Sequence, residues 1–315
     1  YGTVGAYTEL TTNYGDQFRG EIMLDSLNNI LITSSTRSVD FPTASPFQAA
    51  NAGKQDAVVF KIKNDFTGLL FSSYYGGSEN DAGYSINIDS SLNMVFTGGT
   101  SSLDLPGTAG GIQPAYGGGM CDGYVAKLDW DGSTMLQSTY VGTADYDQSF
   151  FVEIDRWDNI YIVGQSLGAM PVSVGAYSNP GSAQFIWKID PDLAGTAYTT
   201  VFGNGSGTID ISPSAFLVDV CGNVYISGWG ANILQPIGLT GMPVTTDAFL
   251  GTSPNGFDFY LFVLERDAND ILYGSYLGGE FADEHVDGGT SRFDKFGIVY
   301  QSVCGGCGGY SDFPT

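Results

Sequence analysis

Acidic side chains recur at matching places along this chain of 315 residues, each just before a run of residues typical of a β-strand. Aspartates gathered at one place could hold Ca²⁺ or another hard cation, and in a sheet ring the first strand of each unit would line a central channel. The alternative is that each carboxylate caps a turn by accepting hydrogen bonds from backbone N–H groups. The positions are Asp16, Asp81, Asp147 and Asp283, with Asp210 a poorer match.

The cysteines are the second group that could do chemistry. Cys304 and Cys307 form a Cys-x-x-Cys pair, a spacing found in zinc half-sites, redox pairs and structural bridges. In an exported β-protein the bridge fits best, and we predict a local disulfide. Cys221, in the equivalent turn of the neighbouring unit, could instead pair with one of them. Cys121 is either free or paired outside this sequence.

Two further acidic motifs resemble metal sites in part. Asp129 and Asp131 imitate an Asp-x-Asp-x-Asp-Gly calcium loop, but the glutamate that completes such a loop is missing, which favours a turn. His285 stands among acidic residues that could bind a metal or titrate near neutral pH. Since one imidazole cannot supply a multi-histidine zinc site, ordinary hydrogen bonding is the simpler interpretation.

Motifs of catalysis are sparse. The sequence has no Gly-x-Ser-x-Gly elbow and no phosphate-binding Gly-x-x-x-x-Gly-Lys, and with a single histidine a catalytic triad would rest on His285 alone. A glycosidase needs only two carboxylates, which 34 acidic residues leave open. Four tryptophans could stack on sugars, although packing between strands is their more common role. They are Trp130, Trp157, Trp187 and Trp229.

An internal repeat shows which elements must position these residues. The motif that begins at Asp25 returns at Asp89, Asp155 and Asp219, and in degenerate form at Asp294, with steps of 64, 66, 64 and 75 residues. Three further landmarks follow in fixed order, and self-similarity of this kind is the signature of a repeat architecture. In the first unit they are Phe41-Pro42-Thr43, Asp56-Ala-Val-Val-Phe-Lys-Ile62 and Ser73-Tyr-Tyr-Gly-Gly77.

Each unit reads as four antiparallel strands bounded by turn residues, which predicts an all-β protein built from β-propeller blades. A parallel β-helix would need shorter rungs. Both ends of the sequence look like cuts, so we expect a fragment of a longer chain. The expected repeats are 14–78, 79–144, 145–206 and 207–280, with a partial repeat at 281–315 and a segment 1–13 that ends a preceding blade or supplies a closing strand.

Charge narrows the range of partners. Thirty-four acidic residues against 11 basic ones give a net charge of −23, which repels a phosphate backbone and makes nucleic acid an improbable partner. Such acidity suits solubility outside a cell or the collection of divalent cations. No apolar run is long enough to span a bilayer as a helix.

The landmarks resemble the bacterial β-propeller repeat family often called the SBBP repeat, whose pattern is matched across residues 14 to 280. The segment from His285 to Lys295 and the stretch Tyr300 to Gly309 also resemble large exported proteins of the Bacteroidetes that carry PKD-like modules and a gliding-motility-associated segment. The resemblance implies type IX secretion and a place outside the cell or on its surface. It implies no catalytic residues. The third unit departs from the pattern where Ala169-Met-Pro171 replaces Asp-Phe-Pro.

Together these features predict a non-catalytic extracellular module of a large secreted or surface-anchored protein, acting in adhesion and binding or as a structural spacer. The expected partners are other domains of the same protein, surface or secretion-system proteins, and glycans. A carbohydrate-active propeller enzyme or a lectin is the alternative. Such an enzyme would require two carboxylates that face each other in an open, aromatic-lined mouth.

Overall fold

The computed structural model describes residues 8–13, 15–230, 239–281, 284–286, 291–305 and 312–314, without the side chains of 284, 285, 304 and 305. Its elements are β-strands and two three-residue 3-10 turns, η1 (Asp16–Phe18) and η2 (Arg266–Ala268). The chain divides into two compact units. Unit 1 holds residues 1–11, 17–168 and 188–197, and unit 2 holds residues 12–16, 169–187 and 198–315.

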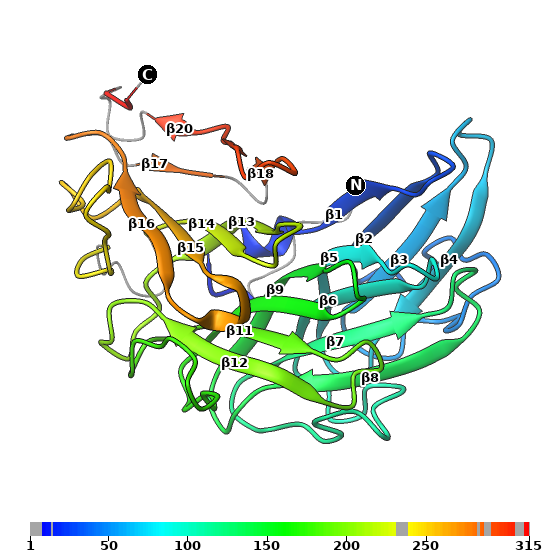
Figure 1. Ribbon diagram of the computed structural model, residues 1–315. Helices are drawn as coiled ribbons and strands as arrows, with labels where there is room; N and C mark the ends of the chain where they lie inside the picture. The colour runs from blue at the N-terminus through cyan, green and yellow to red at the C-terminus, as the bar shows by residue number, and fades with distance from the viewer. Residues whose placement is uncertain are drawn as a thin grey trace. The chain divides into compact units, whose positions relative to one another are not determined.

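Two complete blades lie in unit 1, and Figure 1 shows the strands of each running side by side. Every neighbouring pair within them is antiparallel. Blade 1 has β1 (Glu21–Leu24), β2 (Ile30–Thr36), β3 (Asp56–Ile62) and β4 (Leu69–Tyr75), and blade 2 has β5 (Asp81–Ile88), β6 (Met94–Thr100), β7 (Asp122–Leu128) and β8 (Met135–Val141).

The third and fourth sheets repeat this order, which confirms the predicted all-β fold of four-stranded antiparallel propeller blades. Within the described residues, the predicted partial repeat forms only two-residue strands. Blade 3 has β9 (Asp147–Ile154), β10 (Ile160–Ser166), β11 (Gln184–Ile189) and β12 (Thr196–Phe202); blade 4 has β13 (Ser212–Val218), β14 (Val224–Trp229), β15 (Phe259–Leu264) and β16 (Ile271–Leu277); β17 (Glu284–His285) pairs with β20 (Cys304–Gly305), and β18 (Arg292–Phe293) with β19 (Val299–Tyr300).

The repeated Asp and Asn stabilise the turn of the first hairpin in each blade. Asp25 accepts hydrogen bonds from the backbone N–H groups of Leu27 (2.9 Å) and Asn29 (2.8 Å), and the Asn29 amide donates back to the same carboxylate (2.9 Å). The residue before Asn29 has a positive φ, which asparagine tolerates well. The same turn closes on Asp89, Asp155, Asp219 and Asp294.

The long loop after the second strand is fastened by a tyrosine of the fourth strand. The Tyr74 hydroxyl donates to the carbonyl of Ser38 (2.9 Å) and accepts from the N–H of Phe41 (2.9 Å). Tyr140 fastens the loop of blade 2 in the same way, through Ser102 and Leu105. Two of the sequence landmarks, the proline loop and the Tyr-Gly motif, are therefore hydrogen-bonded to each other.

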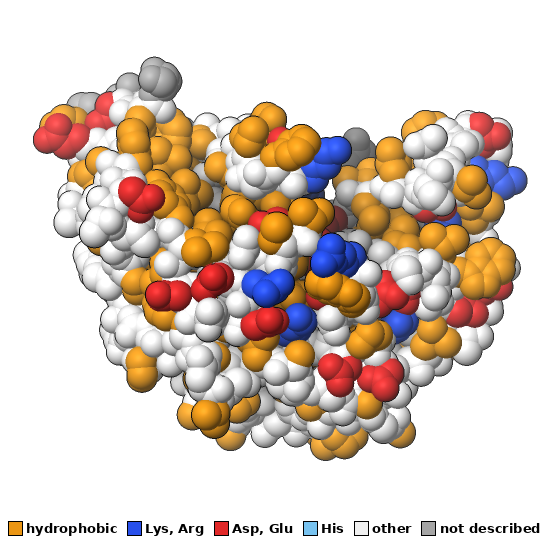
Figure 2. Space-filling view, in the orientation of Figure 1, with side chains coloured by type: hydrophobic (Ala, Val, Ile, Leu, Met, Phe, Trp, Pro, Cys, Tyr) orange, Lys and Arg blue, Asp and Glu red, His pale blue; other side chains and the backbone are white. Residues whose placement is uncertain are grey.

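Aromatic rings fill the space between blades 1 and 2. The ring of Tyr75 lies 5.0 Å from that of Phe96 and 5.1 Å from that of Tyr124, centroid to centroid, and all three side chains are buried. Burial of this much apolar surface is the main term that holds neighbouring blades together. On the face of the molecule in Figure 2, acidic and basic side chains are scattered among many uncharged ones, as the low charged content requires.

Candidate functional site

Two of the predicted acidic residues, Asp81 and Asp147, lie at junctions between consecutive blades and not on an open surface. Asp81 is the first residue of β5 and Asp147 the first residue of β9, and both side chains are fully buried. Asp16 begins η1 and is also buried. Asp283 lies outside the described residues.

Each described carboxylate accepts a backbone hydrogen bond from the turn before it, and Asp81 also accepts from two hydroxyls at the end of the neighbouring strand. Asp81 accepts from the N–H of Gly77 and the hydroxyl of Ser102, both at 2.8 Å, and from the hydroxyl of Thr100. Asp147 accepts from the backbone N–H (2.6 Å) and hydroxyl (2.8 Å) of Thr143. These contacts are those of the turn-capping alternative.

Asp16 follows the same pattern, because its carboxylate accepts from the N–H groups of Thr12 (3.0 Å) and Asn13 (2.6 Å). Among the described residues, no three His, Cys, Asp or Glu side chains come close enough to hold a metal ion together. Binding of Ca²⁺ by these aspartates stays the untested alternative to turn capping.

A second set of buried acids, which the sequence did not single out, faces the first. Asp56 begins β3 and Asp122 begins β7, and both are fully buried. One oxygen of Asp56 accepts from the N–H of Ala52 (2.9 Å) and the amide of Gln48 (2.8 Å), while its Oδ1 has no hydrogen-bond partner. The Oδ1 of Asp122 is likewise buried without a partner. The sequence did contain a signal for these buried acids, because an Asp recurs at the start of the third strand.

Glycine separates the two acids of a junction. A Cβ atom on Gly76 would lie 2.7 Å from Oδ2 of Asp81 and 2.9 Å from Oδ1 of Asp56. On Gly142, at the next junction, it would lie 2.6 Å from Oδ1 of Asp122. The Tyr-Gly motif therefore ends in glycine because a side chain there would collide with the carboxylates.

Burial raises the pKa of both Asp81 and Asp122 to about 7, and that of Asp147 to about 6. The hydrogen bonds to these carboxylates act in the opposite direction, and the facing acid adds to the rise, Asp56 on Asp81 and Asp147 on Asp122. The pKa of Asp56 is raised too, again through burial. Near neutral pH these junctions therefore hold protons that ordinary aspartates would release.

The junction between blades 3 and 4 replaces one acid by an amide. Gln184, which begins β11, has the place of Asp56 and Asp122. With its amide oriented to suit its neighbours, its nitrogen donates to Oδ2 of Asp210 (3.0 Å) and its oxygen accepts from the N–H of Asp210 (2.6 Å). Asp210 is buried, and burial raises its pKa to about 6.

The cysteines that the structure describes are both free thiols. Cys121 is buried, and burial raises the pKa of its thiol, which lies 3.4 Å from the carbonyl oxygen of Asp147. Cys221 is exposed in the β13–β14 turn, so its predicted pairing with Cys304 or Cys307 finds no support. The thiols of those two residues lie outside the description.

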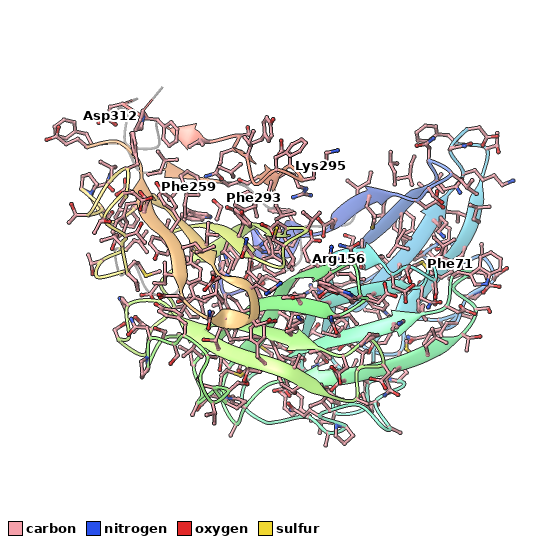
Figure 3. The ribbon with its side chains drawn as sticks, in the orientation of Figure 1. Phe71, Arg156, Phe259, Phe293, Lys295 and Asp312 are labelled. Atoms are coloured by element: carbon pink, nitrogen blue, oxygen red, sulfur yellow. The ribbon has the colours of Figure 1, made fainter. Side chains whose placement is uncertain are left out.

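A surface cleft of about 640 Å³ opens between blades 1 and 2, at the end where their hairpin turns gather. Its lining includes the buried Phe71, which Figure 3 labels, together with Leu70 and Ile88. At its mouth the Trp130 side chain is 60% exposed. Lys61 donates to the carbonyl of Trp130 (3.3 Å), which fixes the turn that carries the indole.

The four tryptophans divide into two kinds. Trp187 and Trp229 are buried, in agreement with a packing role. Trp157 is 52% exposed, and the guanidinium of Arg156 lies 4.0 Å from its ring centroid. Trp130 is thus an exposed tryptophan at the mouth of a cleft. Its neighbours Asp129 and Asp131 accept hydrogen bonds within their own turn, as predicted.

No family model matches the sequence, and no curated protein matches it. One similar solved structure is a protein of unknown function from Bacteroides caccae, with 9% identity and a TM-score of 0.39 over 82% of this chain and 67% of that one. Another is XC5397 from Xanthomonas campestris, described as a gluconolactonase, with 13% identity and a TM-score of 0.27 over 94% of this chain and 95% of that one.

The described part of the chain contains no helix that is long and apolar enough to cross a membrane.

Proposed function

We propose that this chain is a non-catalytic extracellular module of a larger secreted or surface-anchored bacterial protein, acting in binding and adhesion. The observation that carries the proposal is the burial of the repeated acidic residues. Asp56, Asp81, Asp122 and Asp147 are fully buried at the blade junctions, where they shape turns and no substrate can reach them. The residues that recur from blade to blade thus build a scaffold.

Its place outside the cell is supported by the net charge of −23 and by the resemblance of its repeats to SBBP repeats of exported proteins. Type IX secretion and a link to gliding motility belong to the same proposal. The rival glycosidase would need two carboxylates that face each other in an open mouth, whereas the pairs that face each other at the blade junctions are buried. The cleft with Trp130 supports binding over a purely structural spacer.

Two measurements test this function. Antibodies against the purified chain should label intact cells of the organism that makes it, and external protease should remove the label. Incubation with oligosaccharides should release no new reducing ends. Labelling only after the cells are broken, or steady release of reducing ends that a substitution in the chain abolishes, would contradict the proposal.

A further inference from the structure

We infer that the cleft between blades 1 and 2 is a binding site for a neutral oligosaccharide, with the indole of Trp130 as its stacking surface. The inference rests on the proposed binding function and names its ligand class. The volume of the cleft, about 640 Å³, lies in the range of small-molecule sites, and its walls combine apolar side chains with a few polar ones.

The apolar part of the cleft suits the C–H face of a sugar ring. The buried Phe71 and the half-buried Ile88 line this part of the cleft, together with the exposed Leu27 and Leu92. The exposed indole of Trp130 offers a large, rigid surface that loses little conformational entropy when a flat ring covers it. Apolar walls alone would not select a sugar.

The polar rim supplies partners for hydroxyl groups. Lys63, Asp65 and Asp131 line the cleft near its mouth, where they can donate to or accept from hydroxyls. Deeper in, Asp25 and Lys61 lie 3.8 Å apart and balance each other's charge. With three aspartates and two lysines in its lining, the cleft favours a ligand without net charge, and the charge of −23 on the whole chain opposes an anionic one.

The next junction is a natural comparison, because the same repeat positions are filled differently there. Between blades 2 and 3, Ser90 donates through its N–H to Oδ1 of Asp158 (2.8 Å) and through its hydroxyl to the other oxygen, which bridges the rim. The equivalent pair between blades 1 and 2 is Ser26 and Leu92, and leucine cannot accept a hydrogen bond. The first rim therefore lacks this bridge.

The stacking surface differs between the two junctions as well. Lys61 of blade 1 donates to the carbonyl of Trp130, and Lys127 of blade 2 donates in the same way to the carbonyl of Pro191 (2.9 Å). Proline thus stands where the first junction has its indole. Two differences within the repeat distinguish the proposed site from its neighbour. Leu92 replaces Asp158 at the rim, and Trp130 replaces Pro191 as the stacking surface.

The test is a glycan array of neutral and acidic oligosaccharides probed with the whole chain, followed by calorimetric titration of the neutral oligosaccharide that gives the strongest signal. Trp130→Ala should weaken its binding by about tenfold or more, as the loss of a tryptophan anchor does elsewhere. Trp157→Ala removes an exposed tryptophan outside the cleft and should leave the affinity unchanged. Thermal unfolding of each variant checks that it is folded.

Leu92→Asp provides an independent route, because it copies the bridged rim of the next junction. Leu92 has a positive φ of 68°, which aspartate tolerates better than leucine, so the variant should fold and lose binding. Binding to no neutral glycan, binding only to acidic glycans, or an affinity that neither variant changes would overturn the inference. Those results would leave the extracellular, non-catalytic function standing, whereas hydrolysis of the bound glycan would overturn that function instead.

Discussion

Two blade junctions have different side chains at the same repeat positions. They are the junction between blades 2 and 3 and the junction between blades 3 and 4. In the first, Asp122 and Asp147 are both buried carboxyls. In the second, Gln184 donates an amide N–H to Asp210. The amide carries its hydrogen at every pH, whereas a carboxyl pair has one only while a proton remains bound. The comparison indicates that one carboxyl of an acid junction keeps its proton, which takes the place of the amide hydrogen of Gln184.

The largest effect of any single substitution is expected from making the amide junction acidic. Gln184→Glu keeps the shape of the side chain but places a second carboxyl beside Asp210. Unfolding by urea should show a loss of stability on the order of 2 kcal/mol at pH 8, because two buried like charges repel and lack a proton to share. At pH 5 the loss should be much smaller. An equal loss at both pH values would show that the amide acts through its geometry alone.

The pH dependence of the unsubstituted protein tests the junction acids together. Asp81 and Asp122, with pKa values of about 7, and Asp147, at about 6, would ionise near pH 4 in the unfolded chain. The folded state therefore binds more protons between pH 4 and 7, so the free energy of unfolding contributed by these groups falls as pH rises through that window and levels off above it. The free energy of unfolding, measured by urea titration at pH values from about 4.5 to 8.5, should decrease by an amount on the order of a few kcal/mol.

A rise in stability across that window would contradict the assignment, because it would mean that carboxylates of lowered pKa dominate. Lowered values do occur at turn acids such as Asp25 and Asp89, where hydrogen bonds and a lysine outweigh burial. Their contribution is present above the ordinary pKa of about 4 and is lost below it. For this reason, the part of the measured range above pH 5 isolates the junction acids.

The smallest effect comes from the reverse substitution. Asp122→Asn gives the second junction an amide, while its oxygen can still accept from the N–H of Gly117. We expect a gain of about 1 kcal/mol at pH 8 and little change at pH 5. Asp192→Asn removes the same charge from an exposed turn and should have no such pH dependence. A loss of stability at pH 8 for Asp122→Asn would show that an ionised carboxylate is required there.

Much of the fold could be predicted because it is local and repeated. The Asp25 turn, the alternating strands and the order of landmarks are set by residues within about 64 positions of each other, and four copies confirm the pattern. The third repeat was a harder case, yet the loss of its Asp-Phe-Pro landmark left its four strands unchanged.

The candidate sites depended on contacts between blades, which the sequence does not display. Asp81 was identified, but its facing partner Asp56 begins a strand of the preceding blade, and only the folded register brings both against Gly76. The cleft depended on a difference between Leu92 and Asp158 that is visible in the aligned repeats. Its meaning appeared only when each residue could be set beside the serine of the preceding blade.

The most direct measurement is a titration of the aspartate carboxyl carbons by NMR, with the chain labelled with ¹³C, from pH 4 to 9. The account predicts midpoints near pH 7 for Asp81 and Asp122 and near pH 6 for Asp147, unchanged when Ca²⁺ replaces EDTA in the buffer. Midpoints near the ordinary value of about 4, or midpoints that fall when Ca²⁺ is added, would contradict it and would make these aspartates a ligand site and not the frame of the blades.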